Sequence, residues 1–254
     1  MDGFVRAQWQ VPTGVQAFTT TRRGPGHSLP PFDAFNLGDR VGDDPAALAA
    51  NRTALRGALS LPGEPLWLRQ VHGIQVIDAD TVAAGDVPEA DAAVTRQPGR
   101  VLAILTADCL PVLFAARDGS VIGAAHAGWR GLAAGVLEAT VAAMRHDAAR
   151  LVAWIGPGIR QPAFEVGPEV RDAFVAADRL AFAAFKPSPR PAHFLCDLAM
   201  LARLRLMQLG LTAIADCGLC THADGGRFHS HRRDQRTGRM ATVLWSEVDN
   251  RQTS

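Results

Sequence analysis

The sequence predicts an α+β fold in which mixed β-sheets carry helices on their outer faces, built as a single domain over residues 1–254. Apolar runs of strand length alternate with longer segments of helical periodicity, and two neighbouring runs flank an Asp-Gly dipeptide, which is typical of a hairpin turn. Hairpins are thus mixed with α/β crossovers, and the sequence contains no G-x-G-x-x-G or Walker pattern. A doubly wound nucleotide-binding fold is therefore not expected.

In the first 80 residues the patterns predict, in order, a strand at 15–22, a Gly/Pro-rich loop at 22–32, a helix from Pro45 that ends before Pro62, and one or two strands over 66–79. Asp44 directly before Pro45 is the arrangement of an N-cap followed by proline at the first helical position. No repeat or shift in composition marks a domain boundary.

The rest of the chain continues with three apolar runs at 101–107, 111–116 and 121–127, a helix over 131–146, a strand over 151–159, helices from about Gly167 and from Asp197 to Gly210, and strands at 211–217 and 240–246. The helix over 131–146 is alanine-rich with apolar residues at helical spacing. Asp197 and Gly210 have the residue types of an N-cap and a C′ position.

Composition excludes several classes of function. Lys plus Arg number 26 and Asp plus Glu number 25, so the net charge of +1 predicts neither a nucleic-acid nor a membrane partner. The beginning of the sequence lacks a signal-peptide pattern, and no run approaches the ~18 apolar residues of a membrane span, so we expect a cytoplasmic protein. Its 4 cysteines are then expected to be thiols or ligands rather than disulfides. The absence of tyrosine excludes phenol chemistry.

The segment TADCLPVLFAARDGSVIGAAHAGWRG places one cysteine and one histidine on either side of the predicted hairpin. If the turn is centred between Asp118 and Gly119, the numbers of paired residues sum to 237, and Pro111 faces His126. Cys109 lies two residues before Pro111, hence on the same face as His126 at a diagonal of about 7–8 Å. A turn longer by one residue would place the two side chains on opposite faces.

Three interpretations of this pair are open from the hairpin alone. Cys109 and His126 could be a nucleophile and its base, two ligands of a metal such as zinc, or a buried thiol and a buried, hydrogen-bonded imidazole. His72, at a strand end and followed by glycine, is the best candidate for a third group, because glycine lets another segment approach closely.

Several blocks of the sequence together resemble the bacterial laccase-domain family, from about residue 15 to residue 245. These blocks are FNLGDRVGDDP, LRQVHG, TADCLPVLF, AHAGWRGLAAGVLE, AWIGPGIRQPAFEVGPEV, CT and SHRRDQRTGRMATVLW. Members of the family carry the names multicopper polyphenol oxidase, purine nucleoside phosphorylase and peptidoglycan editing factor. The resemblance implies that His72, Cys109 and His126 bind a zinc ion, which three protein ligands would leave with one open, catalytic position.

The resemblance also implies an enzyme: a zinc-dependent purine nucleoside phosphorylase that acts on adenosine, inosine and methylthioadenosine and has adenosine deaminase activity. Water activated at the metal would attack C6 of adenosine, and phosphate would attack C1′ of the ribose. Arg130 is a candidate phosphate clamp ahead of a helix starting near Gly131, or else it packs on Trp129. Asp108 and Glu165 are candidate proton carriers, with a structural role as the alternative for Asp108.

Two other functions remain open. The first is a zinc-dependent amidase that removes misincorporated amino acids from peptidoglycan precursors, and the second is a zinc-stabilised binding module. A laccase of the multicopper type needs on the order of ten histidines, mostly in H-x-H pairs. This chain has 8 histidines and only one H-x-H, so any copper-supported polyphenol oxidation would have to use the His72 site. The sequence assigns no oligomeric state.

The chain departs from the family pattern at a few positions. FHSHRRD replaces a segment that usually reads FFSYRRD, so His229 and His231 replace phenylalanine and tyrosine, and an exposed polar pair or a weak second metal site would explain them. Arg40 stands where histidine is common. Cys217 and Cys220 have the spacing of half a zinc knuckle, but no second pair completes it, which favours structural thiols.

Overall fold

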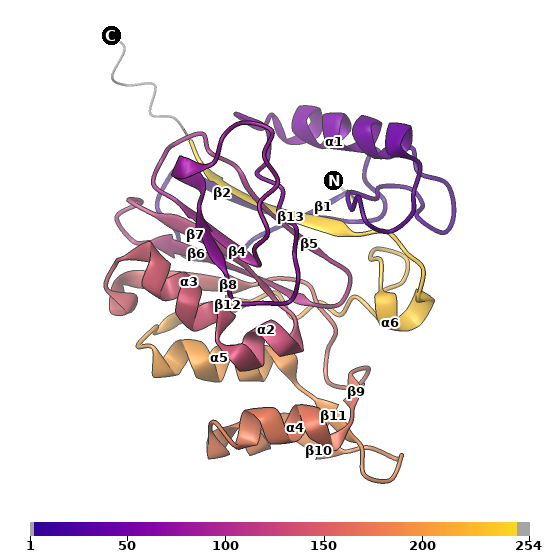
Figure 1. Ribbon diagram of the computed structural model, residues 1–254, viewed down its shortest axis with the longest axis vertical. Helices are drawn as coiled ribbons and strands as arrows, with labels where there is room; N and C mark the ends of the chain where they lie inside the picture. Colours follow the sequence, from indigo (N-terminus) through magenta and orange to yellow (C-terminus); the bar gives the residue numbers. More distant parts are fainter. Residues whose placement is uncertain (1–2, 248–254) are drawn as a thin grey trace.

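Two β-sheets pack face to face between two layers of helix (Figure 1). The computed structural model describes residues 3–247. The first sheet has the order β1 (Phe4–Arg6), β2 (Val15–Thr20), β13 (Met240–Ser246), β5 (Leu102–Thr106). The second has the order β12 (Ala213–Asp216), β8 (Leu151–Ile155), β6 (Leu110–Ala116), β7 (Ile122–Ala127), β4 (Ala92–Thr95), β3 (Val76–Asp78). In the second sheet β3 pairs parallel to β4 and β12 parallel to β8, while the other pairs are antiparallel.

A small third sheet lies at the far end of the molecule, beside helix α4 (Figure 1). It has the order β10 (Phe185–Pro187), β11 (Phe194–Cys196), β9 (Glu165–Val166). The helices are α1 (Pro45–Leu59), α2 (Trp129–Ala134), α3 (Val136–Met144), α4 (Pro168–Val175), α5 (Leu198–Gln208) and α6 (His231–Asp234), with 3₁₀ turns at η1 (Ala79–Thr81), η2 (Ala148–Arg150) and η3 (Arg179–Ala184). The predicted class, α+β with mixed sheets and helices outside, is confirmed.

Alternation along the strands explains the layers. In β6, Leu113 and Ala115 face the first sheet, whereas Val112 and Phe114 face the layer of α3 and α5, so this strand is buried on both sides. Strand β5 alternates in the same way, with Ile104 between the two sheets and Ala103 toward α1. Strand β6, inside the second sheet, and strand β5, at one edge of the first, therefore both carry apolar residues on their two faces.

Helix α1 covers the outer face of the first sheet and begins at the predicted cap. Asp44 accepts hydrogen bonds from the backbone N–H groups of Ala46 and Ala47, Pro45 occupies the first turn, and the helix ends at Ser60, as predicted. Leu55 of this helix is fully buried against the core formed with β5 and β13. The helix from Asp197 is also confirmed, since α5 is capped by the Asp197 side chain and followed by Gly210 at φ +95°.

The structure corrects two of the predicted segments and adds elements that were not predicted. The single helix over 131–146 is two helices, α2 and α3, separated by Gly135 at φ +105°, and it begins earlier, at Trp129. Of the strands predicted over 66–79, only Val76–Asp78 is one, because the rest of this segment forms isolated bridges and turns. Strand β4 and the small third sheet were not predicted.

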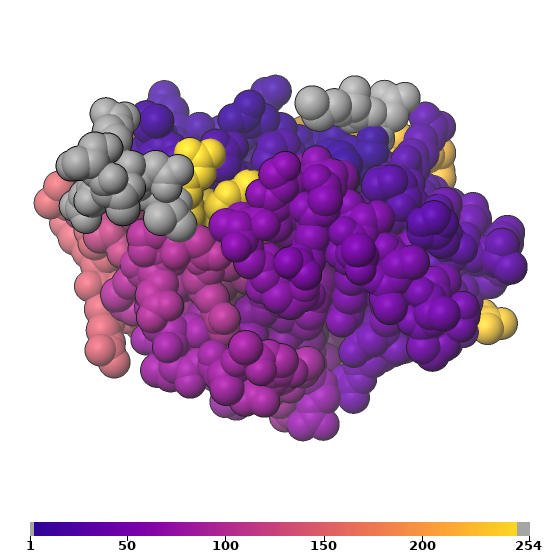
Figure 2. Space-filling model, turned by 90° about the horizontal axis from the view of Figure 1, so that it is seen from above, coloured from indigo at the N-terminus to yellow at the C-terminus, as the bar shows by residue number. Residues whose placement is uncertain are grey.

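The C-terminal strand closes the first sheet. Strand β13 pairs with β2 on one side and β5 on the other, so it lies between segments from the beginning and the middle of the sequence. Viewed from above, a short yellow stretch near the C-terminus shows between indigo and purple residues of the N-terminal half (Figure 2). Within residues 3–247, no helix has both the length and the apolar character needed to cross a membrane.

His229, expected on the surface with His231, is instead fully buried beside β13. Its Nδ1 lies 3.1 Å from Thr237 Oγ1, and its Nε2 has no hydrogen-bond partner among the described residues. Burial and the charge of Arg22 lower the pKa of His229 to about 3. The imidazole is therefore held in its neutral form.

We predict that His229→Phe makes the protein less sensitive to acid. In the unfolded chain histidine takes up a proton near pH 6.5, whereas the folded state resists this down to about pH 3, so stability falls as the pH drops through that window. Relative to wild type, the variant should gain about 2 kcal/mol of unfolding free energy between pH 7 and pH 5. Urea unfolding at both pH values measures this. If the unfolding free energies of His229→Phe and wild type differ by the same amount at both pH values, the prediction is wrong. His231→Phe is the control, because His231 is exposed.

Candidate metal centre

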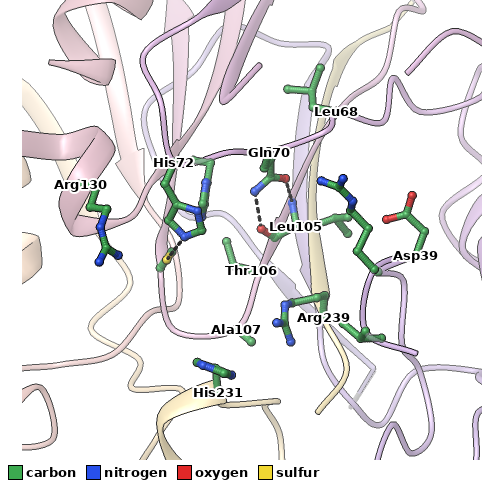
Figure 3. A pocket seen from close by; sticks show the side chains of 15 residues that line it. Asp39, Leu68, Gln70, His72, Leu105, Thr106, Ala107, Arg130, His231 and Arg239 are labelled. Atoms are coloured by element: carbon green, nitrogen blue, oxygen red, sulfur yellow. Dashed lines mark hydrogen bonds between the residues drawn. The ribbon is translucent and has the colours of Figure 1, made fainter. Parts of the chain in front are cut away.

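A cleft of about 580 Å³ opens where the ends of the two sheets meet. Its lining comes from segments distant in the sequence: residues 38–41, Leu68, Gln70, His72, residues 105–107, Cys109, His126, Arg130, His231 and Arg239. Figure 3 shows His72, Arg130, His231 and Arg239 directed into this cleft from different sides. Most of the blocks that carry the family resemblance thus contribute to one cavity.

The hairpin register brings Cys109 and His126 together as predicted. Pro111 pairs with His126, and paired numbers sum to 237 throughout β6 and β7. The loop itself is longer than the predicted two-residue turn, because the last hydrogen bond joins the Ala116 N–H to the Val121 carbonyl. Since this four-residue loop is centred at the same point, between Asp118 and Gly119, the register is unchanged.

Cys109 lies at the point where the chain passes from one sheet to the other. Strand β5 belongs to the first sheet and β6 to the second, with only residues 107–109 between them. Asp108 in this connection has φ +97°, a conformation that non-glycine residues rarely adopt. The strained turn places the Cys109 thiol at the sheet edge, facing the cleft.

His72 is held in a loop rather than a strand. Its φ of +62° is left-handed, which requires the surrounding structure to hold the backbone in place. Gln70 supplies part of this constraint, because its amide nitrogen donates to the Leu105 carbonyl at 2.8 Å and its amide oxygen accepts from the Leu105 N–H at 2.8 Å (Figure 3). The side chain of Gln70 thus replaces a strand pairing and fixes the loop to β5.

Asp91 links the loop of His72 to the strand of His126. This fully buried carboxylate accepts hydrogen bonds from the backbone N–H groups of Val71, His72 and Gly73, at 3.1, 2.9 and 2.6 Å. It also lies 2.8 Å from His126 Nδ1. Burial alone would raise the pKa of Asp91, but the hydrogen bonds from His126 and the backbone hold it below its usual value. The carboxylate therefore keeps the proton of His126 on Nδ1 and leaves Nε2 free to bind a metal.

The donor atoms of His72, Cys109 and His126 lie within 4.8 Å of one another. Cys109 Sγ is 3.8 Å from His72 Nε2, and the two imidazole rings are roughly perpendicular with centroids 4.8 Å apart. Burial opposes ionisation of the thiol, but the charge of His126 and hydrogen bonds from both histidines lower the pKa of Cys109 to about 6. His126 is buried and His72 exposed, so the group is open on the cleft side.

Glycines make room for this group. A Cβ atom at Gly128 would lie 2.9 Å from Cys109 Sγ and 2.9 Å from His72 Cδ2, closer than such contacts occur. A Cβ at Gly131 would lie 2.8 Å from the Gly73 carbonyl oxygen, so α2 can approach the His72 loop only without a side chain there. Both glycines of the segment HAGWRG are thus needed for the three side chains to converge.

The donor set fits a metal ion. Two imidazoles and one low-pKa thiol, with one imidazole oriented by a buried carboxylate, are the ligands and the supporting contact typical of a zinc site with an open position. Among residues 3–247 this is the one group of three or more such side chains placed to hold a metal. Cys217 and Cys220 are free thiols outside it.

Asp108 lies beside this group but faces away from the cleft. Its carboxylate accepts hydrogen bonds from Thr221 Oγ1 at 2.6 Å, Ser230 Oγ at 3.0 Å and the Arg232 N–H at 2.7 Å. It therefore ties the connection between the sheets to the segment that carries α6. The side chain points away from Cys109 as predicted, but because of the bend at residues 107–109 and not because of alternation along a strand.

Glu165 is not brought into the cleft. It lies on β9 of the small third sheet, where its carboxylate accepts a hydrogen bond from the Ser188 hydroxyl and lies 4.0 Å from Arg190.

Arg130 does line the cleft, within the first turn of α2 rather than before it, and its guanidinium stacks 4.5 Å from the Trp129 ring centroid. The packing of Arg130 on Trp129 is therefore observed, and its role as a phosphate clamp stays a prediction.

His231 lines the cleft, whereas His229 does not. His231 Nδ1 lies 2.7 Å from the Gln235 carbonyl oxygen, so Nδ1 carries the proton and donates, and Nε2 is left as the free nitrogen. The two histidines therefore play different parts and make no joint metal site among the described residues.

Fold and cleft together define the class: an α+β protein with a His–Cys–His group, able to hold a metal ion, at the edge of an open cavity. The chain belongs to the family described as multi-copper polyphenol oxidoreductase laccase, whose family model matches residues 16–247. The resemblance seen in the sequence is thus confirmed.

Similar proteins cover nearly the whole chain. A protein named purine nucleoside phosphorylase from Xylella fastidiosa is 52% identical over 248 residues, 94% of this chain and 95% of its own. The Escherichia coli protein named purine nucleoside phosphorylase YfiH is 46% identical over 245 residues, 96% and 99% of the two chains. The crystal structure of Neisseria meningitidis protein NMB0706 is 42% identical with a TM-score of 0.92, over 97% of this chain and 100% of that one.

Asp91, Gln70 and Arg239 were missed from the sequence. The sequence did contain a signal for Asp91, which lies among alanines directly before an apolar strand. An acidic residue in such a position is expected to be buried and therefore to need hydrogen-bond partners. No comparable signal singled out Gln70 or Arg239.

We predict that Asp91→Asn weakens zinc binding about 10- to 100-fold, because the uncharged amide cannot serve three N–H donors and fix the proton of His126 at once. Competition with a chromogenic chelator measures the affinity without any activity assay. Asp118→Asn is the control, since Asp118 lies 3.3 Å from His146 in an exposed pair far from the cleft. Equal zinc affinity in wild type and Asp91→Asn would show that the carboxylate does not support the site.

Proposed function

We propose that this protein is a zinc-dependent purine nucleoside phosphorylase that acts on adenosine, inosine and methylthioadenosine and also deaminates adenosine. One observation carries the proposal: the His72, Cys109 and His126 side chains converge at an open cleft lined with arginines. The names of relatives that are 46–52% identical over nearly the full length support it.

Zinc is the metal that this donor set suits best, and copper, which binds nitrogen and sulfur ligands more tightly, is the alternative ion. When bound by His72, Cys109 and His126, zinc supplies an open position for water or substrate and lowers the pKa of bound water. The buried carboxylate of Asp91 keeps His126 in the tautomer that presents Nε2.

The residues of the chain itself bind and orient the reactants. A cleft of about 580 Å³ is within the usual size range of small-molecule sites, which suits a nucleoside together with phosphate. Arg130 is placed to hold phosphate, because its guanidinium is exposed to the cleft and kept in position by the Trp129 ring. The contacts of Asp108 and Glu165 favour a positioning role over proton transfer.

The runner-up function is an amidase acting on peptidoglycan precursors, since water activated in the same cleft suits amide cleavage as well as deamination. Polyphenol oxidation with copper in the same site is a further alternative. Purified protein assayed with adenosine plus phosphate, and separately with a muramyl-amino acid, distinguishes the first two. Release of free adenine or hypoxanthine that depends on phosphate supports the proposal, and turnover of the muramyl compound alone would contradict it.

We predict that Cys109→Ala abolishes zinc binding and every nucleoside reaction together, because a single metal is proposed to serve them all. Metal analysis of protein purified without added copper, combined with phosphorolysis and deamination assays, tests this. Cys217→Ser should keep the zinc content and both activities, since Cys217 lies outside the group. Deaminase activity retained by Cys109→Ala would contradict the single-site model.

We predict that Arg130→Ala affects the two reactions differently. Phosphorolysis consumes phosphate and deamination consumes water, so the loss of an anion contact should raise the KM for phosphate and slow phosphorolysis by ~10-fold or more, while deamination survives. Arg130→Lys should recover part of the loss, since it keeps the charge without the planar fork. Equal losses in both reactions with a lower Tm would mean that Arg130 only holds α2 in place.

A further inference from the structure

Arg239 is a second arginine in the cleft whose hydrogen-bonding groups are only half used. It precedes β13, and its Nη1 donates to the carbonyl oxygens of Thr237 at 2.9 Å and Gly238 at 3.0 Å. Both hydrogen bonds of the side chain come from Nη1, so Nε and Nη2, which form the other edge of the guanidinium, have no partner among residues 3–247. The turn before β13 thus fixes one edge of the guanidinium and leaves the opposite edge to the cleft (Figure 3).

Three other half-buried arginines of this protein are neutralised by a carboxylate. Arg22, Arg160 and Arg205, with side chains 20%, 14% and 16% exposed, each form an ion pair at 3.0 Å or less. No ion pair among the described residues involves Arg239, although burial is strong enough to lower its pKa. Cys109 and Asp108 attract Arg239 without forming an ion pair with it, so the desolvated cation lacks a paired counter-charge, and an anionic ligand would remove that cost.

The lining of the cleft has a surplus of positive charge. Arg40, Arg130 and Arg239 all line it, and Asp39 is the one carboxylate that does so among the described residues. The chain as a whole is almost neutral, with a net charge of +1, so the surplus is local. Positive charge concentrated in a cavity raises the local concentration of anions.

We propose that Arg239 is a phosphate-binding residue, which holds the tetrahedral anion by its Nε–H and Nη2–H groups on the wall across the cleft from α2. This inference rests on the proposed function and deepens it, since it places the second substrate of phosphorolysis. Two parallel N–H donors at the edge of a guanidinium match two oxygens of one phosphate, and a guanidinium oriented in advance loses little freedom on binding.

The role differs from that of Arg130. Arg130 is exposed at the rim and stacked on Trp129, whereas Arg239 is half-buried and close enough to Cys109 for their charges to interact. Water screens a contact to the anion less at Arg239 than at the rim. Arg239 is thus the arginine that would set phosphate affinity beside the metal group.

Titration calorimetry of the zinc-loaded protein with inorganic phosphate, against chloride at equal ionic strength, tests this directly. Arg239→Gln should raise the Kd for phosphate about 30-fold or more, the loss of a charged bidentate contact. Arg236→Gln is the matched control, since Arg236 lies three residues away, over the Phe32 ring and outside the cleft lining, and should change the Kd less than about 2-fold. In the activity assay, the KM for phosphate should rise while the KM for adenosine in deamination stays unchanged.

Further readouts separate this role from a structural one. Arg239→Lys keeps the charge but loses the fork, and it should give a Kd between those of wild type and Arg239→Gln. Zinc content and Tm show whether a variant still folds. If Arg239→Gln has a lower zinc content or Tm than wild type, the Kd of Arg239→Lys for phosphate is the test. Unchanged phosphate affinity in Arg239→Lys and Arg239→Gln would overturn the inference, as would weaker binding of adenosine alone.

The same measurements distinguish the two levels of the proposal. A wild-type protein that neither binds phosphate nor releases free base, but cleaves the muramyl compound, overturns the phosphorylase assignment. A wild-type protein that binds phosphate and performs phosphorolysis, with Arg239→Gln unchanged in both, overturns only the role of Arg239.

Discussion

The candidate metal centre depends on one buried carboxylate. Asp91 is the common hydrogen-bond acceptor of a loop, through the N–H groups at 71–73, and of a strand, through His126 Nδ1. The loop has no strand pairing at His72, and its left-handed backbone is unfavourable by itself. The charge of Asp91 therefore compensates the backbone strain and orients an imidazole with the same two oxygens, so that loop conformation and ligand geometry cannot change independently.

The passage between the two sheets is the second constraint. Because residues 107–109 connect strands that belong to different sheets, the thiol of Cys109 is placed by the packing of the whole sandwich rather than by a flexible loop. Asp108, in its strained conformation, is held by Thr221, Ser230 and the backbone of Arg232. These contacts bring the α6 segment, with His231, under the cleft.

Local patterns predicted the parts of this structure that local rules govern. The hairpin register followed from where the Asp118-Gly119 turn is centred, which is why the pairing was right although the loop is longer. Helix α1 was predicted from its cap. The break at Gly135 was missed, because an isolated glycine within an apolar helical period does not reveal that the backbone turns left-handed there.

What the sequence could not reveal depends on distant contacts. Asp91 and His126 are 35 residues apart, and the burial of His229 follows from the position of β13, so neither has a signature in the neighbouring residues. His229 was expected outside for this reason. At His72 the family resemblance supplied what the local pattern could not, because no hydrophobic periodicity indicates that His72 lies near Cys109.

The position of β13 has a consequence for how the protein is made. All three candidate metal ligands leave the ribosome well before residues 240–246, yet β13, an inner strand of the first sheet, is the last of the described strands to be synthesised. Until it inserts between β2 and β5, the strand end next to Cys109 lacks its neighbour, and the wall of the cleft that carries Arg239 does not exist. If these side chains bind a metal, a nascent chain offers a thiol and two imidazoles before the site has its final shape, and that shape is reached only after residues 240–246 have been made.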